Sequence, residues 1–362
     1  MRIDYVITGL DIGGAEFQII NLVEQLAKRG HDMRVISLTP PLAFTERLAA
    51  ANIPLHSLEM SSGMHLPVAL WRLRSLLKQS PPDIVHGHMV HANLLVRLVR
   101  LLLPKLKVIC TAHNIHEGGK LRDWAYRLTN PLSQLNTTIS EAATHRFVEE
   151  RVFPKNRTLT IFNGIDTDKF HPPAHHSENA EPFRWLAVGR LVEQKDYPTL
   201  ITAFSLIKKS KLLIAGQGKL LASLQQQVRQ SDLENRVEFL GVRLDADELY
   251  RQVDGFVLSS AWEGYGLVVA EAMASGLPVV VTDSGGPSEI VGNQGTAGIL
   301  VPIKDPQALA NAMLTIETLP FNERETMGQE ARKQIQERFS LNQIVTQWIE
   351  IYDELKSNNK ES

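Results

Sequence analysis

Two glutamates stand eight positions apart in the apolar run "SSAWEGYGLVVAEAMASG", residues 259–276. Glu263 falls in the turn after a predicted strand, and Glu271 falls inside the helix that follows. Eight residues of continuous helix would separate their Cα atoms by about 12 Å. A glycosidase acid and nucleophile need carboxyl groups about 5–10 Å apart, and metal ligands lie closer still. The spacing favours two contacts along one elongated ligand over an acid–base pair or a metal site.

A glycine pair, Gly13 and Gly14, follows the first predicted strand in "TGLDIGGAE" and precedes a helix. Paired glycines let the backbone approach a ligand closely, and the N-terminus of a helix attracts phosphate. The spacing does not fit the dinucleotide fingerprint Gly-x-Gly-x-x-Gly. A phosphate contact and a tight turn that needs glycine for steric reasons both remain open.

Two cations, Arg190 and Lys195, follow another predicted strand in "AVGRLVEQKDYPTLI". Arginine offers forked donors and lysine a point charge, and the combination suits a diphosphate group. Two basic side chains on a solvated loop are the alternative.

The elements that must position these residues are short apolar strands alternating with helical stretches, from "IDYVIT" (3–8) to "PVVVTD" (278–283). This alternation predicts an α/β fold with parallel sheets covered by helices on both faces. Asn-Gly and Pro-Pro in residues 161–183 indicate a turn-rich connection. We therefore expect two Rossmann-like, doubly wound domains, 1–168 and 182–340, facing across a cleft. A C-terminal helix, 341–362, could cross back to the first domain.

Composition limits the class of protein. With 43% hydrophobic and 22% charged residues, the chain is typical of soluble globular proteins. A single cysteine, Cys110, permits no intramolecular disulfide and fits a reducing compartment. The N-terminus predicts a strand rather than a signal peptide, and no apolar run reaches the length of a membrane span. We expect a cytoplasmic protein. Aromatic residues make up 6% of the chain, which makes nucleic acid a poor candidate partner.

Charge is distributed unevenly. Residues 1–165 carry 19 Lys and Arg against 13 Asp and Glu, a net +6, and the remainder carries −8. The segments "LPVALWRLRSLLKQS" and "NLLVRLVRLLLPKLK" are apolar with spaced basic residues, among them Arg97 and Arg100. Such helices either lie on an anionic membrane surface or pack on a sheet with their basic tips in water. Peripheral contact with the inner face of the plasma membrane is therefore a hypothesis.

Several motifs together resemble a known family. "EGYGLVVAE" resembles the Glu-x7-Glu motif of the retaining nucleotide-sugar glycosyltransferases of family 4, which have the GT-B fold. "NGIDTDKF", "VGRLVEQKD", "FLGVR" and "TDSGGPSEIV" extend the resemblance over nearly the whole chain. "HGHMVHANLLVRLVR" and "CTAHNIHEGGK" are similar to bacterial enzymes that assemble O-antigen or capsule. The resemblance implies an acceptor-side domain at 1–168 and a nucleotide-sugar donor domain at 182–340.

The resemblance also implies roles for individual residues. Glu263 would contact hydroxyls of the donor sugar, Glu271 would bind the ribose, and His113 would lie near the transferred sugar. Arg190 and Lys195 would hold the diphosphate and stabilise the leaving nucleoside diphosphate. Further donor contacts are implied at Gly13, Gly14, Val242, Arg243, Gly264, Tyr265, Gly266 and Leu267.

The implied reaction moves a hexose or N-acetylhexosamine from a UDP- or GDP-sugar to a growing, lipid-diphosphate-linked glycan with retention of configuration. No covalent nucleophile is evident beside the sugar site, which favours same-face attack with the leaving diphosphate taking the acceptor proton. A GT-B-fold nucleotide-sugar epimerase, a glycogen-synthase-like polymerase and a non-catalytic nucleotide-sugar-binding subunit are alternatives. The presence of Glu263, Arg190 and Lys195 argues against the last.

Neither a cofactor nor a metal ion is expected. His86, His88, His91, His113 and His116 lie near predicted strand ends. His113 and His116 have a spacing at which histidines bind zinc, but no cysteine or carboxylate cluster completes the ligand set. We expect these histidines to line an acceptor cleft.

Overall fold

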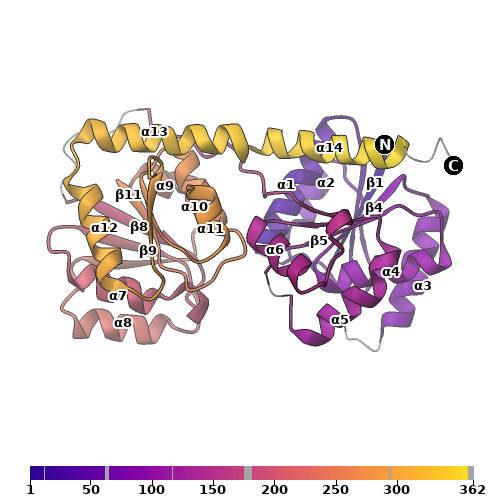
Figure 1. The fold of residues 1–362 in the computed structure, drawn as a ribbon, viewed down its shortest axis with the longest axis horizontal. Helices are drawn as coiled ribbons and strands as arrows, with labels where there is room; N and C mark the ends of the chain where they lie inside the picture. Colours follow the sequence, from indigo (N-terminus) through magenta and orange to yellow (C-terminus); the bar gives the residue numbers. More distant parts are fainter. Residues whose placement is uncertain (12, 62–64, 116, 175–181, 293–294, 358–362) are drawn as a thin grey trace. The chain divides into compact units, whose positions relative to one another are not determined.

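The computed structural model describes residues 1–11, 13–61, 65–115, 117–174, 182–292 and 295–357. The chain forms two compact units (Figure 1). The N-terminal unit comprises Met1–Gly164 and Asn342–Ser362, and the C-terminal unit comprises Ile165–Leu341. The expected connection, 161–183, is thus divided: its residues up to Gly164 belong to the N-terminal unit, and those from Ile165 onward belong to the C-terminal unit. The last helix, α14 (Leu341–Ser357), belongs to the N-terminal unit from its second residue onward.

The N-terminal unit is built on a seven-stranded sheet with the order β3-β2-β1-β4-β5-β6-β7 and only parallel pairs. The strand order reverses between β1 and β4. Buried runs of Val, Ile and Tyr explain the central strands, because both faces of a parallel sheet are covered. The strands are β1 (Arg2–Ile7), β2 (Asp32–Ser37), β3 (Leu55–Ser57), β4 (Ile84–His88), β5 (Val108–Ala112), β6 (Leu135–Thr138) and β7 (Thr158–Thr160).

Helices connect these strands. In α3, Ala69, Leu73 and Leu77 repeat every four residues and are buried, so this helix packs through one apolar stripe. Ser140 caps α6 by accepting a hydrogen bond from the backbone N–H of Ala143 at 3.2 Å. The helices are α1 (Gly14–Lys28), α2 (Thr45–Ala50), α3 (Leu66–Gln79), α4 (Val90–Leu102), α5 (Lys120–Thr129) and α6 (Glu141–Glu149), with short 3₁₀ turns at η2 (Asn130–Leu132) and η3 (Lys155–Arg157).

Helix α14 is joined to the sheet of the N-terminal unit by aromatic and polar contacts. The Tyr352 hydroxyl lies 2.8 Å from Nδ1 of His86, on β4, and also hydrogen-bonds the hydroxyl of Tyr5 on β1. The Trp348 ring packs on His86 with the ring centroids 4.6 Å apart. Burial of these rings holds the end of the chain against the first strands, which explains why α14 clusters with residues distant in sequence.

Arg97, which the sequence placed on a membrane-facing or water-facing surface, is completely buried. Its guanidinium donates to Asn136 Oδ1 at 2.6 Å and to Thr129 Oγ1 at 2.9 Å, and lies 4.8 Å from the ring centre of Tyr126. Both expectations for this side chain are wrong. Arg97 lies on the inward face of α4, where polar partners from α5 and β6 satisfy it.

Among the helices of the described residues, none has the length and apolar character that a membrane-spanning segment requires.

The C-terminal unit has a six-stranded parallel sheet with the order β10-β9-β8-β11-β12-β13. Its strand order reverses between β8 and β11, so this unit repeats the plan of the first. The predicted α/β class with two doubly wound units is confirmed. The strands are β8 (Arg184–Val188), β9 (Lys211–Ala215), β10 (Val237–Gly241), β11 (Gly255–Leu258), β12 (Val279–Thr282) and β13 (Gly298–Val301).

The helices of this unit pack around a core that includes Trp185, Leu200, Phe204 and Met313, all fully buried. They are α7 (Tyr197–Ser205), α8 (Leu221–Gln230), α9 (Ala246–Arg251), α10 (Leu267–Ala274), α11 (Gly286–Val291), α12 (Pro306–Thr318) and α13 (Phe321–Arg338), with a 3₁₀ turn at η4 (Glu193–Lys195).

Arg332 on α13 holds the connecting segment to the C-terminal unit. Its guanidinium donates to the carbonyl oxygens of Thr167 at 3.1 Å, of Phe170 at 2.9 Å and of Ala274. Ile165 forms a parallel bridge with Ser340. These bonds satisfy backbone acceptors in a segment without regular structure, which explains why the unit begins at residue 165.

Replacing Arg97 by Met is expected to lower the free energy of unfolding by about 3 kcal/mol, because Asn136 and Thr129 lose a buried charged donor. Urea unfolding followed by circular dichroism measures the loss. Arg100→Met is the matched control on the same helix. Arg100 is partly exposed, so this substitution should cost less than about 1 kcal/mol. Equal losses for the two variants would contradict the buried role of Arg97.

Candidate functional site

The loops after β8 and β11 meet where the strand order of the C-terminal sheet reverses. In open parallel sheets, ligands bind at the carboxyl ends of the strands beside such a point. The loop after β8 carries Arg190 and Lys195, and the loop after β11 carries Glu263. Three residues selected from separate sequence motifs thus share one edge of one sheet.

Lys195 and Glu263 form an ion pair between these two loops. Their side chains are 14% and 9% exposed, respectively. The Ser260 hydroxyl donates a second hydrogen bond to Glu263 Oε1 at 2.9 Å. A mostly buried pair of this kind fixes the position of both charged groups, because either group left alone would lose its compensation. The site therefore presents a pre-oriented ammonium and carboxylate.

Backbone contacts hold both members of the pair. The Ser259 hydroxyl donates to the carbonyl oxygen of Lys195 at 2.9 Å, and the Glu263 N–H donates to the carbonyl oxygen of Ser284 at 2.8 Å. The loop after β9 also approaches closely. A Cβ on Gly216, which has a φ of +146°, would lie 1.9 Å from the Gly189 carbonyl oxygen. Glycine is therefore required where the two loops cross.

Arg190 lies on the same loop as Lys195 and has an exposed side chain. In the part of the chain that the structure describes, its guanidinium has no hydrogen bond or ion pair. Arg243 differs, because its guanidinium donates a hydrogen bond to Asp245 Oδ1 at 2.8 Å. This hydrogen bond from Arg243 lowers the pKa of Asp245 to about 2. Arg243 and its exposed neighbour Val242 follow β10 at the carboxyl edge of the same sheet. Of the two arginines, Arg190 is the one available to an anionic ligand.

The turn from β11 into α10 contains Gly264, Tyr265, Gly266 and Leu267. Gly266 precedes the first helical residue with a φ of +92°, and a Cβ there would lie 2.7 Å from Pro287 Cγ. The Tyr265 side chain is buried. This compact turn directs the first N–H groups of α10 out of the carboxyl edge of the sheet, where a helix N-terminus attracts anions.

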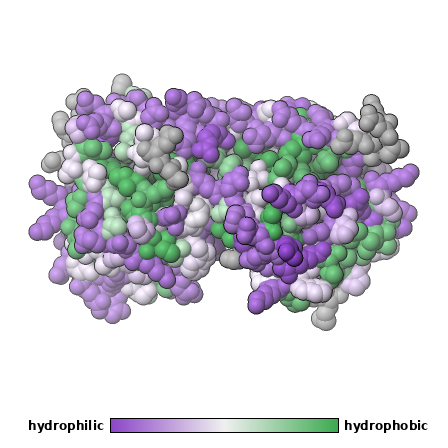
Figure 2. All heavy atoms as spheres, in the orientation of Figure 1, coloured by the Kyte–Doolittle hydropathy of each residue, from purple (hydrophilic) through white to green (hydrophobic). Residues whose placement is uncertain are grey.

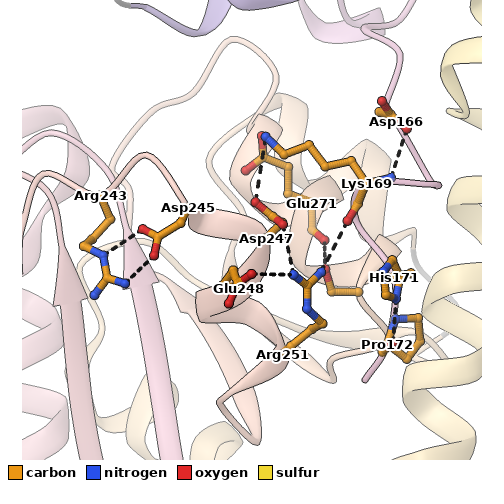
Figure 3. A network of polar contacts seen from close by, with 11 residues as sticks. Asp166, Lys169, His171, Pro172, Arg243, Asp245, Asp247, Glu248, Arg251 and Glu271 are labelled. Carbon is orange, nitrogen blue, oxygen red and sulfur yellow. Dashed lines mark hydrogen bonds and ion pairs between the residues drawn. The ribbon is translucent and has the colours of Figure 1, made fainter. Parts of the chain in front are cut away.

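Glu271 has a different environment from Glu263. It lies one turn inside α10, accepts a hydrogen bond from the Tyr250 hydroxyl at 3.0 Å, and is partly buried. Burial raises its pKa to about 7, and the Tyr250 bond acts in the opposite direction. Figure 3 shows Glu271 near Lys169 and Asp247. Glu263 and Glu271 therefore have different hydrogen-bond partners. Different partners are consistent with two separate contacts to one ligand.

A polar network around Glu271 was not expected from the sequence (Figure 3). Arg251 on α9 pairs with Asp247 at 3.0 Å and with Glu248 at 3.5 Å, and the Lys169 ammonium lies 3.8 Å from Asp247. The Arg251 pairs lie within α9, and the Lys169 contact joins α9 to the connecting segment. The i,i+4 spacing of Asp247 and Arg251 is a local signal, but the contact with Lys169 links residues 78 positions apart and leaves no local trace.

In the N-terminal unit, Gly13 and Gly14 lie at the start of α1. Gly13 has an extended backbone with a φ of −151°, a conformation open to any residue. The three nearest atoms that a Cβ there would meet all belong to the flexible carboxylate of Glu16, the closest at 2.4 Å. The tight-turn interpretation is therefore wrong for Gly13, and close approach by a ligand stays as a prediction.

His113 follows β5 and forms a buried pair with His88, at the end of β4; Nε2 of His113 lies 3.0 Å from Nδ1 of His88. Burial lowers the pKa of His113 to about 4, and it also lowers the pKa of His88 well below its ordinary value. Both rings are thus neutral at neutral pH. Among the described residues, His88 Nε2 and His113 Nδ1 have no hydrogen-bond partner. One donor and one acceptor of the pair remain for a ligand.

The loop carrying His113 is held by Glu117, which sequence reasoning missed. The His113 N–H donates to Glu117 Oε1 at 2.9 Å, and the Tyr126 hydroxyl donates to Glu117 Oε2 at 2.5 Å. Burial raises the pKa of Glu117 to about 7. His116, the second histidine of the possible zinc pair, lies outside the described residues. Within those residues, no cluster of three His, Cys, Asp or Glu could hold a metal ion.

The raised pKa of Glu271 predicts a pH-dependent stability. The folded state binds the proton more tightly than the unfolded chain, so the protonated group's contribution is fully present below about pH 4.5 and is lost as the pH rises through about 7. Glu271→Gln should match the natural protein at pH 5 and exceed its unfolding free energy by about 2 kcal/mol at pH 8. Urea titrations at both pH values measure this. Glu330→Gln, at an exposed position of the same unit, is the control, and a pH-independent difference would contradict the assignment.

Comparison with known proteins agrees with this architecture. Residues 12–169 match the family described as Glycosyltransferase Family 4, and residues 169–334 match the family described as Glycosyl transferases group 1. The Anabaena protein Alr3699/HepE, solved in complex with UDP, has the same fold, with a TM-score of 0.85 and 22% identity over 98% of this chain and 100% of that one.

Two relatives of known name cover different shares of the sequence. N-acetyl-alpha-D-glucosaminyl L-malate synthase of Bacillus anthracis is 26% identical over 96% of both chains. UDP-Gal:alpha-D-GlcNAc-diphosphoundecaprenol alpha-1,3-galactosyltransferase of Escherichia coli is 28% identical over 68% of this chain and 70% of its own. The two parallel-sheet units and the two family matches lead to one conclusion: the chain is a GT-B-fold glycosyltransferase, built from a glycosyltransferase family 4 domain followed by a group 1 domain.

Proposed function

We propose that this glycosyltransferase moves a sugar from a UDP- or GDP-sugar to a growing, lipid-diphosphate-linked glycan, with retention of configuration, in bacterial surface polysaccharide synthesis. The observation that carries the proposal is the buried Lys195–Glu263 pair at the point where the C-terminal sheet reverses its strand order. A carboxylate accepts hydrogen bonds from sugar hydroxyls, and an ammonium beside it attracts a diphosphate. Glu263 could therefore bind the sugar, and Lys195 the diphosphate, of a nucleotide sugar.

The donor is proposed to extend along the carboxyl edge of the C-terminal sheet. Arg190 and Lys195 hold the diphosphate, Glu263 contacts hydroxyls of the sugar, and the N–H groups of the Gly264–Leu267 turn face the phosphate. Glu271, one turn further into α10, binds the ribose. Val242 and Arg243 contact the base. The Tyr250–Glu271 bond of 3.0 Å supports this arrangement, because it fixes the carboxylate.

The chemistry is proposed to rest on charge stabilisation. As the bond between sugar and diphosphate breaks, negative charge grows on the leaving oxygen, and Arg190 and Lys195 stabilise it. The acceptor hydroxyl attacks from the same face and gives its proton to the departing diphosphate. On the N-terminal side, Gly13 and Gly14 leave room for phosphates and acceptor. His113 contributes a neutral imidazole near the transferred sugar, since burial lowers its pKa to about 4.

The names of two relatives support two candidate acceptors. The name of the Escherichia coli relative describes a diphosphoundecaprenol-linked acceptor, which supports a lipid-linked glycan and a location at the inner face of the plasma membrane. The name of the Bacillus anthracis relative contains L-malate, and that relative matches over 96% of this chain. A small hydroxy acid is therefore the second candidate acceptor.

A mass-spectrometric screen tests the reaction class. Purified protein is incubated with each of several UDP- and GDP-sugars and either a lipid-diphosphate monosaccharide or L-malate. We expect one donor to add a hexose or N-acetylhexosamine mass to the lipid acceptor. A donor isomerised without any acceptor would instead identify an epimerase, and transfer to malate alone would identify the second candidate.

Substituting the central pair should remove transition-state stabilisation. We expect Lys195→Ala and Glu263→Gln each to lower kcat/KM by about 10²–10³, because each removes a pre-oriented charge at the reacting centre. Steady-state transfer rates measure the loss. Glu193 lies on the same loop as Lys195 and forms an exposed pair with Lys219. Glu193→Gln breaks this pair, is the matched control and should retain full activity. A Glu263→Gln protein with the natural rate would refute the role given to Glu263.

Turnover is proposed to be independent of a bound divalent ion, because Arg190 and Lys195 supply the cations for the diphosphate. Activity should therefore change by less than about twofold when 5 mM EDTA replaces 5 mM MgCl₂ in the assay. A strict requirement for added metal would contradict this part of the mechanism.

A further inference from the structure

Helix α5 (Lys120–Thr129) carries an exposed apolar stripe. Leu121, Trp124 and Leu128 are 84%, 59% and 66% exposed. Positions i, i+3 and i+7 of a helix lie on one face, so the three side chains form one stripe along α5. The opposite face is buried through Asp123 and Tyr126. Large apolar side chains gathered on the solvent side of an amphipathic helix are typical of a docking surface.

The charged residues that accompany the stripe on α5 are basic wherever they are exposed. Lys120 and Arg127 are exposed at the two ends of the helix. The acidic residue of α5, Asp123, is buried and paired with Arg146, whose Nη1 lies 3.1 Å away. Residues 1–165 of the chain, almost all of which belong to this unit, carry a net +6. On the face of the N-terminal unit drawn in Figure 2, green apolar residues lie next to strongly hydrophilic, purple ones.

This charge pattern selects among occupants. A second copy of the same helix would bring Lys120 and Arg127 against like charges, which is unfavourable. An anionic bilayer complements them: leucine enters the acyl boundary, tryptophan lies at the headgroup level, and lysine and arginine meet lipid phosphates. We propose that α5 docks the protein on the surface of an anionic lipid bilayer through Leu121, Trp124 and Leu128. The choice of a lipid surface agrees with, and in part rests on, the proposed lipid-linked acceptor.

The inner face of α5 connects this surface to the candidate site. Tyr126 donates to Glu117, which accepts the backbone N–H of His113. Arg122 donates to the Glu117 carbonyl oxygen at 2.8 Å. The helix that meets the bilayer therefore also holds the loop that carries His113. A docked α5 fixes the position of this loop relative to the lipid surface from which a lipid-linked acceptor would arrive.

This surface replaces the one that the sequence suggested. The segment around Arg97 is basic and apolar in sequence, but its arginine points into the unit and is fully buried. Helix α5 did not stand out in the sequence, because its apolar and basic residues alternate with buried polar ones. The structure shows that Leu121, Trp124 and Leu128 are exposed whereas Tyr126 is buried. The sequence does not distinguish these large side chains.

Vesicle co-sedimentation tests the proposal without any sugar substrate, so its outcome is independent of the reaction proposed above. The probe is phosphatidylcholine vesicles with 30% phosphatidylglycerol, and neutral phosphatidylcholine vesicles for comparison. We expect the natural protein to bind the anionic vesicles, and the variant L121Q/W124Q/L128Q to bind them at least tenfold more weakly. The three side chains are exposed, so melting temperature and circular dichroism should not change. Leu206→Gln, an exposed apolar position in the C-terminal unit (46% exposed), is the matched control and should bind normally.

Two further readouts distinguish lipid docking from self-association through the same stripe. Brominated lipids should quench the tryptophan fluorescence of the natural protein, and Trp124→Gln should remove most of that quenching although four other tryptophans remain. Lys120→Glu should weaken binding to anionic vesicles only. Equal binding by the triple variant, no binding by the natural protein, or a stripe that affects only self-association in sedimentation velocity would each overturn the proposal.

Discussion

The ion pair between Lys195 and Glu263 is the interaction on which the candidate site depends. Removing two charges from water is costly, and an ion pair compensates for this only with good geometry and additional hydrogen bonds. Here the Ser260 hydroxyl supplies an additional bond to the carboxylate, and Ser259 and Ser284 fix the two backbones through bonds of 2.9 and 2.8 Å. The loops after β8, β11 and β12 are consequently held together before any ligand binds. A diphosphate would meet a lysine that is already oriented.

The N-terminal unit uses burial in a different way. His88 and His113 are removed from water, so their pKa values fall and both rings stay neutral. Glu117 is also buried, and its pKa rises to about 7. The carboxyl edge of this sheet is thus polar but weakly charged, whereas the C-terminal edge carries a fixed ammonium and an available arginine. A sugar hydroxyl suits the first environment and a diphosphate suits the second.

The fold could be predicted from local pattern to a large extent. Runs such as "YVI" at Tyr5–Ile7 and "VVV" at 279–281 are strands, because continuous β-branched and aromatic residues are typical of strands buried on both faces. The predicted turn with two glycines after β11 is also present, and α10 begins at Leu267, directly after Gly266. The environment of buried charges could not be predicted. Arg97 follows the same basic, apolar spacing as a surface residue, and its burial depends on Asn136, which lies 39 positions later.

The sequence by itself determined the residue types and their places along the chain: glycines at helix starts, cations after β8 and glutamates in and after the turn that follows β11. It did so because strand, turn and helix signals act over a few residues. The tertiary structure decided which of these groups meet. Lys195 pairs with Glu263, His88 with His113, and Tyr352 with His86 across 266 positions. Burial and pairing set the charge and orientation of a side chain, and both arise only when distant segments pack together.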